Sequence, residues 1–326
     1  MEVSKIAINS NEAGARVTTF YQLNTIFLSM IMEAIPFVLV GVLIAGLIQS
    51  FVTEQWIARV MPKNRVLSSL LGCSVGVFFP SCECGIVPIT RRLLNKGVPL
   101  NAGIAFMLTG PIVNPIVVFS TFIAFGNDWT MAAIRAGMAF AVALAVSLTI
   151  ALLFPTLPLR HANHFQHATA ETAATSETPA HHLVAVGRPA WYARIYSVLL
   201  HSIDEFFSVG KYLVLGAFIA ASMQTFVPTS TLLHLGSNPV TATLIMMALA
   251  FVMSLCSEAD AFIASSFRST FSTGALSAFL VFGPMIDIKN TLMLLGTFRT
   301  KFVIVLISLV ALFTLVGALI VGRVWG

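Results

Sequence analysis

Long hydrophobic runs follow one another along this chain, and short polar segments separate them. Runs of about 20 apolar residues, the length that crosses a bilayer as a helix, lie at 21–52, 99–126, 129–154, 198–227, 239–256, 274–297 and 302–322. Residues 1–20 form a polar N-terminal segment without the basic start of a signal peptide. The pattern predicts an all-α polytopic membrane protein whose first span targets it to the membrane.

The two halves of the chain repeat each other at one fixed offset. The segment that begins at Gly41 reappears at Gly216, and Glu83 corresponds to Glu258 at the same shift, since 216 − 41 and 258 − 83 both equal 175. An acidic residue at matching points of two hydrophobic repeats is costly in lipid. It indicates a transport site near the middle of the membrane.

A polar linker at 156–196 separates the first transmembrane repeat, 21–155, from the second, 197–326. The linker has little hydrophobic periodicity and is predicted to be solvated and cytoplasmic. Its histidines are His161, His164, His167, His181 and His182. The first three, at intervals of three residues, could chelate a divalent metal from one face of a helix turn, but a merely polar linker explains them as well.

Composition supports the membrane class and excludes others. The chain is 57% hydrophobic and 10% charged, whereas a soluble domain carries roughly 25% charged residues. Its net charge of +5 comes from basic residues in short loops beside the spans, which is the positive-inside pattern of an inner (cytoplasmic) membrane protein and not a nucleic-acid-binding surface. Neither a nucleotide-binding glycine loop nor a hydrolase nucleophile arrangement is present. We therefore expect a multi-pass permease that is not an enzyme and needs no cofactor.

Two segments, 66–97 and 241–268, are too interrupted to be simple spans. Each either crosses the membrane with an unwound centre or enters and returns as a re-entrant hairpin, and irregular backbone at that depth must line a cavity or be buried in protein. Basic residues on both sides of the first segment favour the hairpin, because both clusters are then cytoplasmic. The clusters are Arg59, Lys63 and Arg65 before it, and Arg91, Arg92 and Lys96 after it.

One hairpin in each half gives that half an odd number of crossings, so the two homologous halves are predicted to be inverted repeats, a common plan in transporters. The turn at 126–128 and the loop at 228–238 carry no Lys or Arg, which suits an outside position. Eight full spans with parallel repeats and a cytoplasmic N-terminus are the alternative.

The run from Pro80 to Gly85, Pro-Ser-Cys-Glu-Cys-Gly, is the most specific local pattern in the chain. Both end residues are expected to break a helix, and two thiols beside a carboxylate suit copper(I), zinc or thiophilic metalloids. We predict substrate binding at Cys82 and Cys84, with Cys256 as a third thiol from the other half, and metal binding at the first two. The alternative is that these cysteines pack as small hydrophobic residues.

Glu83 and Glu258 are the predicted proton-coupling residues. An ionised carboxylate is costly in a low dielectric, which allows a buried carboxyl group to exchange a proton near neutral pH. A structural role is the alternative, in which Glu258 caps the broken helix or pairs with Arg268.

Glycine–proline pairs interrupt the next predicted span of each half. They are Gly110-Pro111 and Gly283-Pro284. Each break would free backbone carbonyls, and Asn114 or Asp287 would add a side-chain oxygen that binds a polar substrate or ion. Asp260 adds acidity to the second half, and Lys289 could neutralise Asp287 only on an irregular backbone, because residues two apart do not share a helix face. Packing kinks are the alternative interpretation of both pairs.

These motifs resemble a known family. The runs Phe79-Pro-Ser-Cys-Glu-Cys-Gly-Ile-Val-Pro88, Thr109-Gly-Pro-Ile-Val-Asn-Pro115 and Ser257-Glu-Ala-Asp260 are similar to those of the predicted permeases that include the organoarsenical efflux permeases. The resemblance covers nearly the whole chain except the linker and the N-terminal segment. It implies an inner-membrane permease, binding of trivalent organoarsenicals at Cys82 and Cys84, and, for some relatives, a small thioredoxin-like or metal-handling protein partner.

The function predicted from these residues is secondary export of a thiophilic metalloid, metal or organo-derivative through a midplane site. The expected partners are the lipid bilayer and the small thiophilic substrate or ion, and a homo-oligomer is compatible with the sequence. A transmembrane thiol redox relay with a thioredoxin-like partner is the alternative, although the chain has no Cys-x-x-Cys motif. A metal-sensing scaffold would explain neither the helix breaks nor the buried carboxylates.

Overall fold

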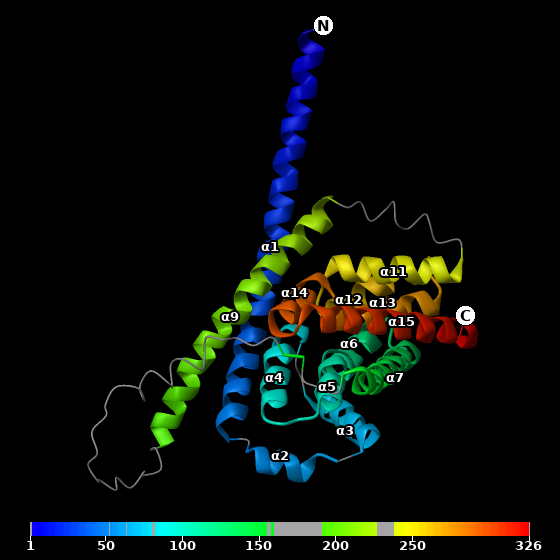
Figure 1. The fold of residues 1–326 in the computed structure, drawn as a ribbon. Helices are drawn as coiled ribbons and strands as arrows, with labels where there is room; N and C mark the ends of the chain where they lie inside the picture. Colours follow the sequence, from blue (N-terminus) through cyan, green and yellow to red (C-terminus); the bar gives the residue numbers. More distant parts are fainter. Residues whose placement is uncertain are drawn as a thin grey trace, which may run out of the picture.

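The computed structural model of this chain is almost entirely helical (Figure 1). It describes residues 2–51, 53–62, 64–79, 82–154, 158–159, 191–226 and 238–325. The predicted helix breaker Pro80 and the linker histidines lie outside the described residues. Within them, six helical segments are long and apolar enough to cross a membrane: Thr18–Ile48, Leu100–Ala124, Trp129–Leu153, Ser202–Thr225, Thr273–Thr297 and Thr300–Trp325. The prediction of an all-α polytopic membrane protein is confirmed.

The first half runs from one long helix through two interrupted segments into a second long helix. Its helices are α1 (Glu2–Phe51), α2 (Glu54–Val60), α3 (Arg65–Phe78), α4 (Glu83–Asn95), α5 (Leu100–Val113), α6 (Pro115–Ala124) and α7 (Trp129–Leu153). The polar N-terminal segment continues into the first span within α1. The interruption between α5 and α6 falls at Asn114, whose extended backbone is favoured because Pro115 follows it.

The second half repeats this order. Its helices are α9 (Trp191–Phe226), α11 (Pro239–Met253), α12 (Ser257–Ser266), α13 (Thr273–Met285), α14 (Ile288–Thr297) and α15 (Thr300–Trp325). The hydrophobic run predicted at 239–256 forms a helix of only 15 residues, α11, which ends where Ser254 adopts a left-handed backbone conformation with a φ of 46°. The other predicted runs coincide with the six segments of spanning length.

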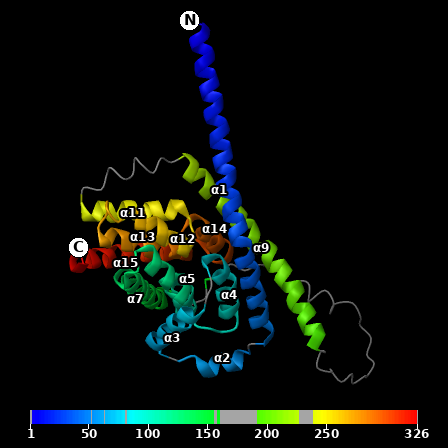
Figure 2. The same cartoon turned by 180° about the vertical axis from the view of Figure 1, so that it is seen from behind.

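The two halves share one internal packing pattern. α5 lies between α3 and α7, and α13 lies between α11 and α15. Across the boundary between the halves, α4 contacts α14 and α6 contacts α12. The long helices α1 and α9 cross each other at one side of the molecule, where α1 packs on α4 and α9 packs on α14 (Figures 1 and 2). The four short helices that follow the breaks therefore form the centre at which the halves meet.

Both ends of the α3–α4 segment lie at the same end of α5. The side-chain amide of Asn101, in the first turn of α5, donates hydrogen bonds to the carbonyl oxygen of Arg65 and to the hydroxyl of Ser69, each at 2.9 Å. Arg65 begins α3, and α4 leads into α5 through the short turn 96–99. The segment thus runs away from this end and returns to it, with the break between α3 and α4 at the far end.

The turn after α12 lies beside the turn after α6. The Arg268 guanidinium donates a hydrogen bond to the carbonyl oxygen of Phe125 at 3.3 Å and lies 4.0 Å from a carboxylate oxygen of Asp128. Since α5 and α6 together form one segment of spanning length, these two turns lie at the opposite end of that segment from the turn 96–99.

Equivalent glycines of the two long helices permit close contact with the centre. A Cβ atom added at Gly41 of α1 would lie 2.6 Å from the carbonyl oxygen of Gly85 in α4, and one at Gly216 of α9 would lie 2.8 Å from the Cα of Lys289 in α14. Small residues let membrane helices approach this closely. The prediction that Gly85 breaks a helix is wrong, because Gly85 lies in the first turn of α4 and serves the contact with α1.

Candidate functional site: a buried charge cluster between the halves

Each half begins a short helix at its predicted thiol–carboxylate position. In the first half, Cys82 is the N-cap of α4 and Glu83 is its first residue. In the second half, Cys256 is the N-cap of α12 and Glu258 lies in its first turn. The Cys256 sulfur accepts a hydrogen bond from the backbone N–H of Ala259 at 3.4 Å, so Cys256 caps this helix and Glu258 does not. Both breaks therefore present helix N-termini, with their free N–H groups, together with thiol and carboxyl side chains.

A lysine of the second half is shared between two carboxylates. The Nζ of Lys289 lies 3.9 Å from Oε1 of Glu83 and 3.8 Å from Oδ2 of Asp287. All three residues are buried, with 2% exposure for Glu83, 0% for Asp287 and 4% for Lys289. Oε2 of Glu83 and Oδ2 of Asp287 have no hydrogen-bond partner. One ammonium group therefore faces two acids at nearly equal distance, and its contact with Glu83 joins the two halves.

The break between α13 and α14 explains how Asp287 and Lys289 share a charge. Asp287 has an extended backbone and is the N-cap of α14, where its Oδ1 accepts a hydrogen bond from the N–H of Asn290 at 2.6 Å. Because Asp287 precedes the helix, helical spacing does not separate its side chain from that of Lys289. The expectation that the two residues meet only on an irregular backbone is confirmed.

Asn114, the first-half counterpart of Asp287, is engaged within the protein. Its Oδ1 accepts a hydrogen bond from the N–H of Val117 at 2.9 Å, and its Nδ2 donates one to the carbonyl oxygen of Gly110 at 3.1 Å. The side chain thus caps α6 and holds the end of α5. Substrate binding by Asn114 stays a prediction, and it would require one of these hydrogen bonds to be replaced.

The glycine–proline pairs do not themselves end the helices. Gly110-Pro111 lies inside α5 and Gly283-Pro284 lies inside α13, and the interruptions follow at Asn114 and Ile286. The prediction was wrong in position because proline removes a hydrogen bond to the preceding turn without forcing the following residues out of the helix. Gly283 makes room for a carboxylate, since an added Cβ atom would lie 3.2 Å from Oδ2 of Asp260.

Three of the four cysteines lie near Glu83, the acid that contacts the shared lysine. The thiols of Cys82 and Cys84 interact with each other. Cys256 interacts with the carboxylate of Glu33 on α1 and lies within electrostatic range of Glu83. All four cysteines are free. The structure thus brings thiols of both halves to the neighbourhood of the predicted coupling carboxylate.

The fourth cysteine belongs to the hydrophobic core. Cys73 is fully buried in α3 and interacts with Thr109 of α5. Among the described residues, no group of three or more His, Cys, Asp or Glu side chains is arranged to hold a metal ion. Cys82 and Cys84 therefore offer two thiols without a preformed cage, and substrate or metal binding there stays a prediction.

A second buried set of charges lies at α12. Arg135 of α7 is fully buried, and its guanidinium donates hydrogen bonds to the hydroxyl of Thr121 at 2.7 Å and to the carbonyl oxygen of Ser257 at 2.8 Å. Asp260 and Glu258 lie within electrostatic range of this guanidinium. Asp260 is 1% exposed, and its Oδ2 has no hydrogen-bond partner. Arg135 therefore ties the first half to the backbone at the start of α12.

Sequence reasoning missed Arg135 and the contact between Glu83 and Lys289. A lone arginine inside the apolar run 129–154 was a usable signal, because an ionisable residue at membrane depth faces the protein interior and finds a partner there. Arg268, considered as a partner of Glu258, instead contacts the turn that follows α6.

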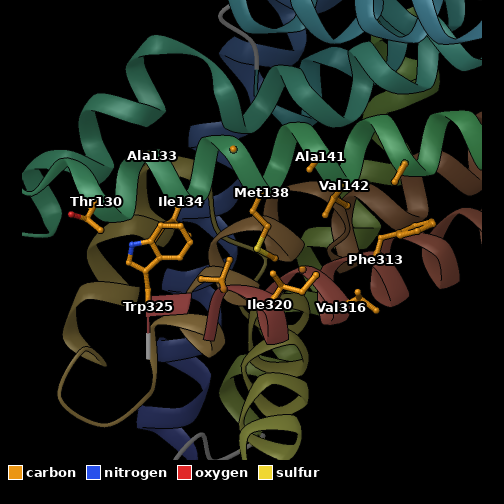
Figure 3. Close-up of a pocket in the computed structure, with 14 residues that line it drawn as sticks. Thr130, Ala133, Ile134, Met138, Ala141, Val142, Phe313, Val316, Ile320 and Trp325 are labelled. Atoms are coloured by element: carbon orange, nitrogen blue, oxygen red, sulfur yellow. The ribbon is translucent and has the colours of Figure 1, made fainter. Parts of the chain in front are cut away.

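An apolar groove of about 530 Å³ lies elsewhere, between α7 and α15 (Figure 3). Apolar side chains such as Ile134, Met138 and Phe313 line it, and Trp325 lies at one end. None of its lining side chains is ionisable. The groove suits lipid chains, so the charged centre between the halves is the candidate transport site.

Comparison with known proteins agrees with this architecture. A family described as a predicted permease matches residues 19–323. The YcgR protein of Bacillus subtilis is 55% identical over 304 residues, which cover 93% of this chain and 98% of YcgR. A Streptococcus mutans protein named as a subunit of a two-component membrane permease complex is 44% identical over 297 residues, which cover 91% of this chain and 94% of that protein.

A more distant relative covers only part of the chain. The YraQ protein of Escherichia coli is 28% identical over 117 residues, which cover 36% of this chain and 31% of YraQ. No solved structure matches the chain. The family match over nearly the whole length, together with six helical segments of spanning length, establishes that this multi-pass membrane protein belongs to the predicted permease family.

Proposed function

We propose that this permease is a secondary transporter that exports a thiophilic metalloid, metal or organo-derivative through the centre where its halves meet. The observation that carries the proposal is the position of Cys82 and Cys84 on either side of Glu83, whose contact with Lys289 joins the halves. Thiols bind soft species, and a change at the contact acts on both halves. Cargo binding and coupling thus share one place.

Glu83 supplies the coupling in this proposal. Lys289 lies 3.9 Å from Glu83 and 3.8 Å from Asp287, so it is held by electrostatic attraction to both acids. When a proton neutralises Glu83, Lys289 is left with Asp287, and the attraction between α4 and α14 falls. Release of the proton restores it. Protonation thereby shifts the balance between two arrangements of the halves, and Glu258, partly exposed at the matching position of α12, takes part in the same proton exchange.

The halves are proposed to be inverted repeats. Both ends of α3–α4 lie at the same end of α5, as a re-entrant hairpin requires, which leaves three spans in each half. The contact of Arg268 with Phe125 and Asp128 supports the same topology, because it keeps the turn after α12 on the side opposite the turn 96–99. Equivalent turns of the two halves, 96–99 and 267–272, then face opposite sides of the membrane.

A thiol redox relay with a thioredoxin-like partner is the second candidate. The interaction between the thiols of Cys82 and Cys84 favours it, because neighbouring thiols can pass two electrons to an oxidised acceptor, form a labile disulfide and be reduced again by two electrons from the thioredoxin-like partner. The name of the Streptococcus mutans relative also suggests a partner subunit for this chain. The relay leaves Lys289 and its two acids without a role, so export is preferred.

Cellular accumulation tests the export proposal. Cells that express the wild type, the Cys82→Ser/Cys84→Ser double variant or the core control Cys73→Ala would be exposed separately to methylated arsenicals, arsenite, antimonite, zinc and copper, with element content read by mass spectrometry. Export predicts that one species falls in cells with the wild type or the control and recovers with the double variant. Unchanged contents across the panel would count against a thiophilic cargo, and trapped mixed disulfides with a soluble protein would favour the relay.

A further inference from the structure

We infer that Asp260 is a proton-binding site in the second half, in addition to Glu83 in the first half. The inference rests on the proposed proton coupling and deepens it. The repeat does not identify this group, because Asp260 corresponds to Gly85 at the same offset, since 260 − 85 = 175. Its burial, its unpaired oxygen and the charge balance around α12 identify it instead.

Asp260 lies in an enclosed position. It belongs to the first turn of α12, is 1% exposed, and keeps Oδ2 without a hydrogen-bond partner. Gly283 of α13 provides the room for this oxygen, because an added Cβ atom would lie 3.2 Å from it. An ionised oxygen without a partner is costly at membrane depth. The free Oδ2 is therefore the atom that binds the proton.

Arg135 is fixed in place but does not pair directly with Asp260. Its two terminal nitrogens are bound by Thr121 and by the carbonyl oxygen of Ser257, and its Nε has no partner. The guanidinium acts on Asp260 through space, and no salt bridge forms between these two described residues. The positive charge thus stabilises the carboxylate after the proton leaves, without occupying the oxygen to which the proton returns.

The two charge sets have the same balance when the exposed Glu33, which also acts on Lys289, is left aside. Each contains two carboxylates and one cation that acts on an acid of the other half, by contact in the first set and through space in the second. The first set is Glu83, Asp287 and Lys289, and the second is Glu258, Asp260 and Arg135. With every group ionised, each set carries one uncompensated negative charge, which one proton removes. In the second set this proton is assigned to Asp260, because Asp260 is buried, whereas the partly exposed Glu258 remains free to take part in proton exchange.

The charged groups that act on Asp260 come from three helices. They are Arg135 of α7, Glu258 of α12, and Asp287 and Lys289 of α14. The helices α6 and α13, which also pack on α12, contribute no charged side chain. Since Asp287 and Lys289 belong to the first set as well, a proton bound at one site changes the electrostatic energy at the other. The two proton sites are thereby coupled.

A proton fits this position better than a metal ion. Hard cations take several oxygen ligands, whereas Asp260 offers one free oxygen beside a guanidinium. The described part of the chain also has no metal-binding group of three His, Cys, Asp or Glu side chains.

Infrared difference spectroscopy of the full chain in lipid tests the inference without any cargo. A protonated carboxyl group gives a carboxylic acid C=O stretching band that an ionised carboxylate lacks. Loss of such a band when the pH is raised therefore reports each titrating carboxyl group. Asp260→Asn is expected to remove one such band from the wild-type spectrum, and Glu83→Gln should remove a different one. Glu258→Gln, and Asp204→Asn at an exposed position of α9, should keep the Asp260 band.

Two further variants keep the test decisive. Arg135→Gln removes the opposing charge and leaves the acid, so the Asp260 band should persist to higher pH. Asp260→Glu keeps a carboxyl group and should shift the band without removing it, which serves where Asp260→Asn fails to fold. Three results would each overturn the inference. The first is a spectrum of Asp260→Asn that keeps all wild-type bands, and the second is loss of the assigned band in Glu258→Gln instead. The third is disappearance of the assigned band when Na⁺ is added at constant pH. A chain that exports no tested cargo would still show the band, so this result and the export result are separable.

Discussion

The Nζ of Lys289 lies 3.9 Å from Oε1 of Glu83, across the contact between α14 of the second half and α4 of the first. Gly216 of α9 packs directly on the backbone at Lys289, and Gly41 of α1 packs on Gly85, two residues after Glu83. The two long helices therefore hold the backbone at both partners. Any motion that separates α4 from α14 must break this charge contact and must also disturb either a glycine contact or the packing of α1 on α9.

Removal of the lysine is expected to destabilise the protein. Lys289→Gln would leave Glu83 and Asp287 buried with no cation between them, and loss of one partner of a buried pair costs about 3–5 kcal/mol. The double variant Lys289→Gln/Glu83→Gln removes both charges of the inter-half contact and should recover part of the loss. Thermal unfolding of the purified variants in detergent measures the effect. A single variant as stable as the wild type would contradict the contact.

Gly216→Ala is expected to disturb the centre by steric overlap. Its added Cβ atom would lie 2.8 Å from the Cα of Lys289, and overpacking of this kind costs about 1–3 kcal/mol. Gly210→Ala on the same helix is the matched control, because nothing lies within 4 Å of a Cβ atom added there, and alanine favours a helix over glycine by about 1 kcal/mol. Unfolding midpoints should fall for the first variant and stay equal or rise for the second. Equal effects from both would show that α9 is free to move away from α14.

Glu205 of α9 is expected to stabilise the packing of α9 on the end of α4. Its carboxylate is buried and forms ion pairs with Arg92 and, at 3.7 Å, with Arg91. Glu205→Gln should lower the free energy of unfolding by about 1.5–3 kcal/mol, the range for hydrogen bonds to charged groups. The partial exposure of both arginines favours the lower part of that range. Asp204→Asn, at the exposed neighbouring position, is the control and should change little in denaturant or thermal unfolding.

The spans and the acidic positions were predictable because both follow from local pattern. The length of an apolar run determines whether it can cross the membrane, and one offset relates Glu83 to Glu258. Contacts between the halves were not predictable. Arg135 meets the carbonyl oxygen of Ser257 across 122 residues of sequence, and only the packing of α6 between α7 and α12 brings them together. The partner of Glu83 was missed for the same reason.

The positions of the helix breaks depend on caps that sequence reasoning did not weigh. The helix continues past Gly110-Pro111 and stops at Asn114, where the side chain caps α6 and the following Pro115 favours an extended backbone. Asp287 acts in the same way as the N-cap of α14. The residues assigned as ligands thus also define the breaks, and the glycine–proline pairs lie just before them.

Asp128 is expected to make the stability of α7 depend on pH. Its Oδ1 accepts a hydrogen bond from the N–H of Thr130 at 2.8 Å and caps the helix. This bond, followed by the Thr130 hydroxyl and the Arg268 guanidinium, holds the pKa of Asp128 below its ordinary value. A lowered folded-state pKa gives stability that is complete above the unfolded-state value of about 3.9, and that is lost as the pH falls through the folded-state value.

Asp128→Ala should therefore lower the unfolding midpoint at neutral pH, and its difference from the wild type should shrink below about pH 4. Asp128→Asn keeps a capping oxygen and should lose less. Unfolding followed by circular dichroism over a pH series measures both variants. A difference from the wild type that does not vary with pH would contradict a role for the ionised carboxylate.

Two positions distinguish inverted from parallel repeats. With inverted repeats, a cysteine at Arg59 in α2 faces the cytoplasm and one at Thr270 after α12 faces the outside, and with eight spans and parallel repeats both assignments reverse. Asn95→Cys is inside and Thr130→Cys is outside in either topology, so these variants are the controls. All four residues are exposed. Each cysteine variant, in a background without native cysteines, is treated with a membrane-impermeant maleimide before and after cell lysis. Labelling before lysis shows that the residue faces the outside.

We expect Thr270→Cys to react on intact cells and Arg59→Cys to react only after lysis. Arg268, close to Thr270 in the chain, contacts Phe125 and Asp128, and the turn at 126–128 has no Lys or Arg, as the positive-inside pattern requires of an outside turn. The reverse labelling would assign parallel repeats. It would also require the contact between Arg268 and Asp128 to be absent in the membrane, because the two turns would then lie on opposite sides.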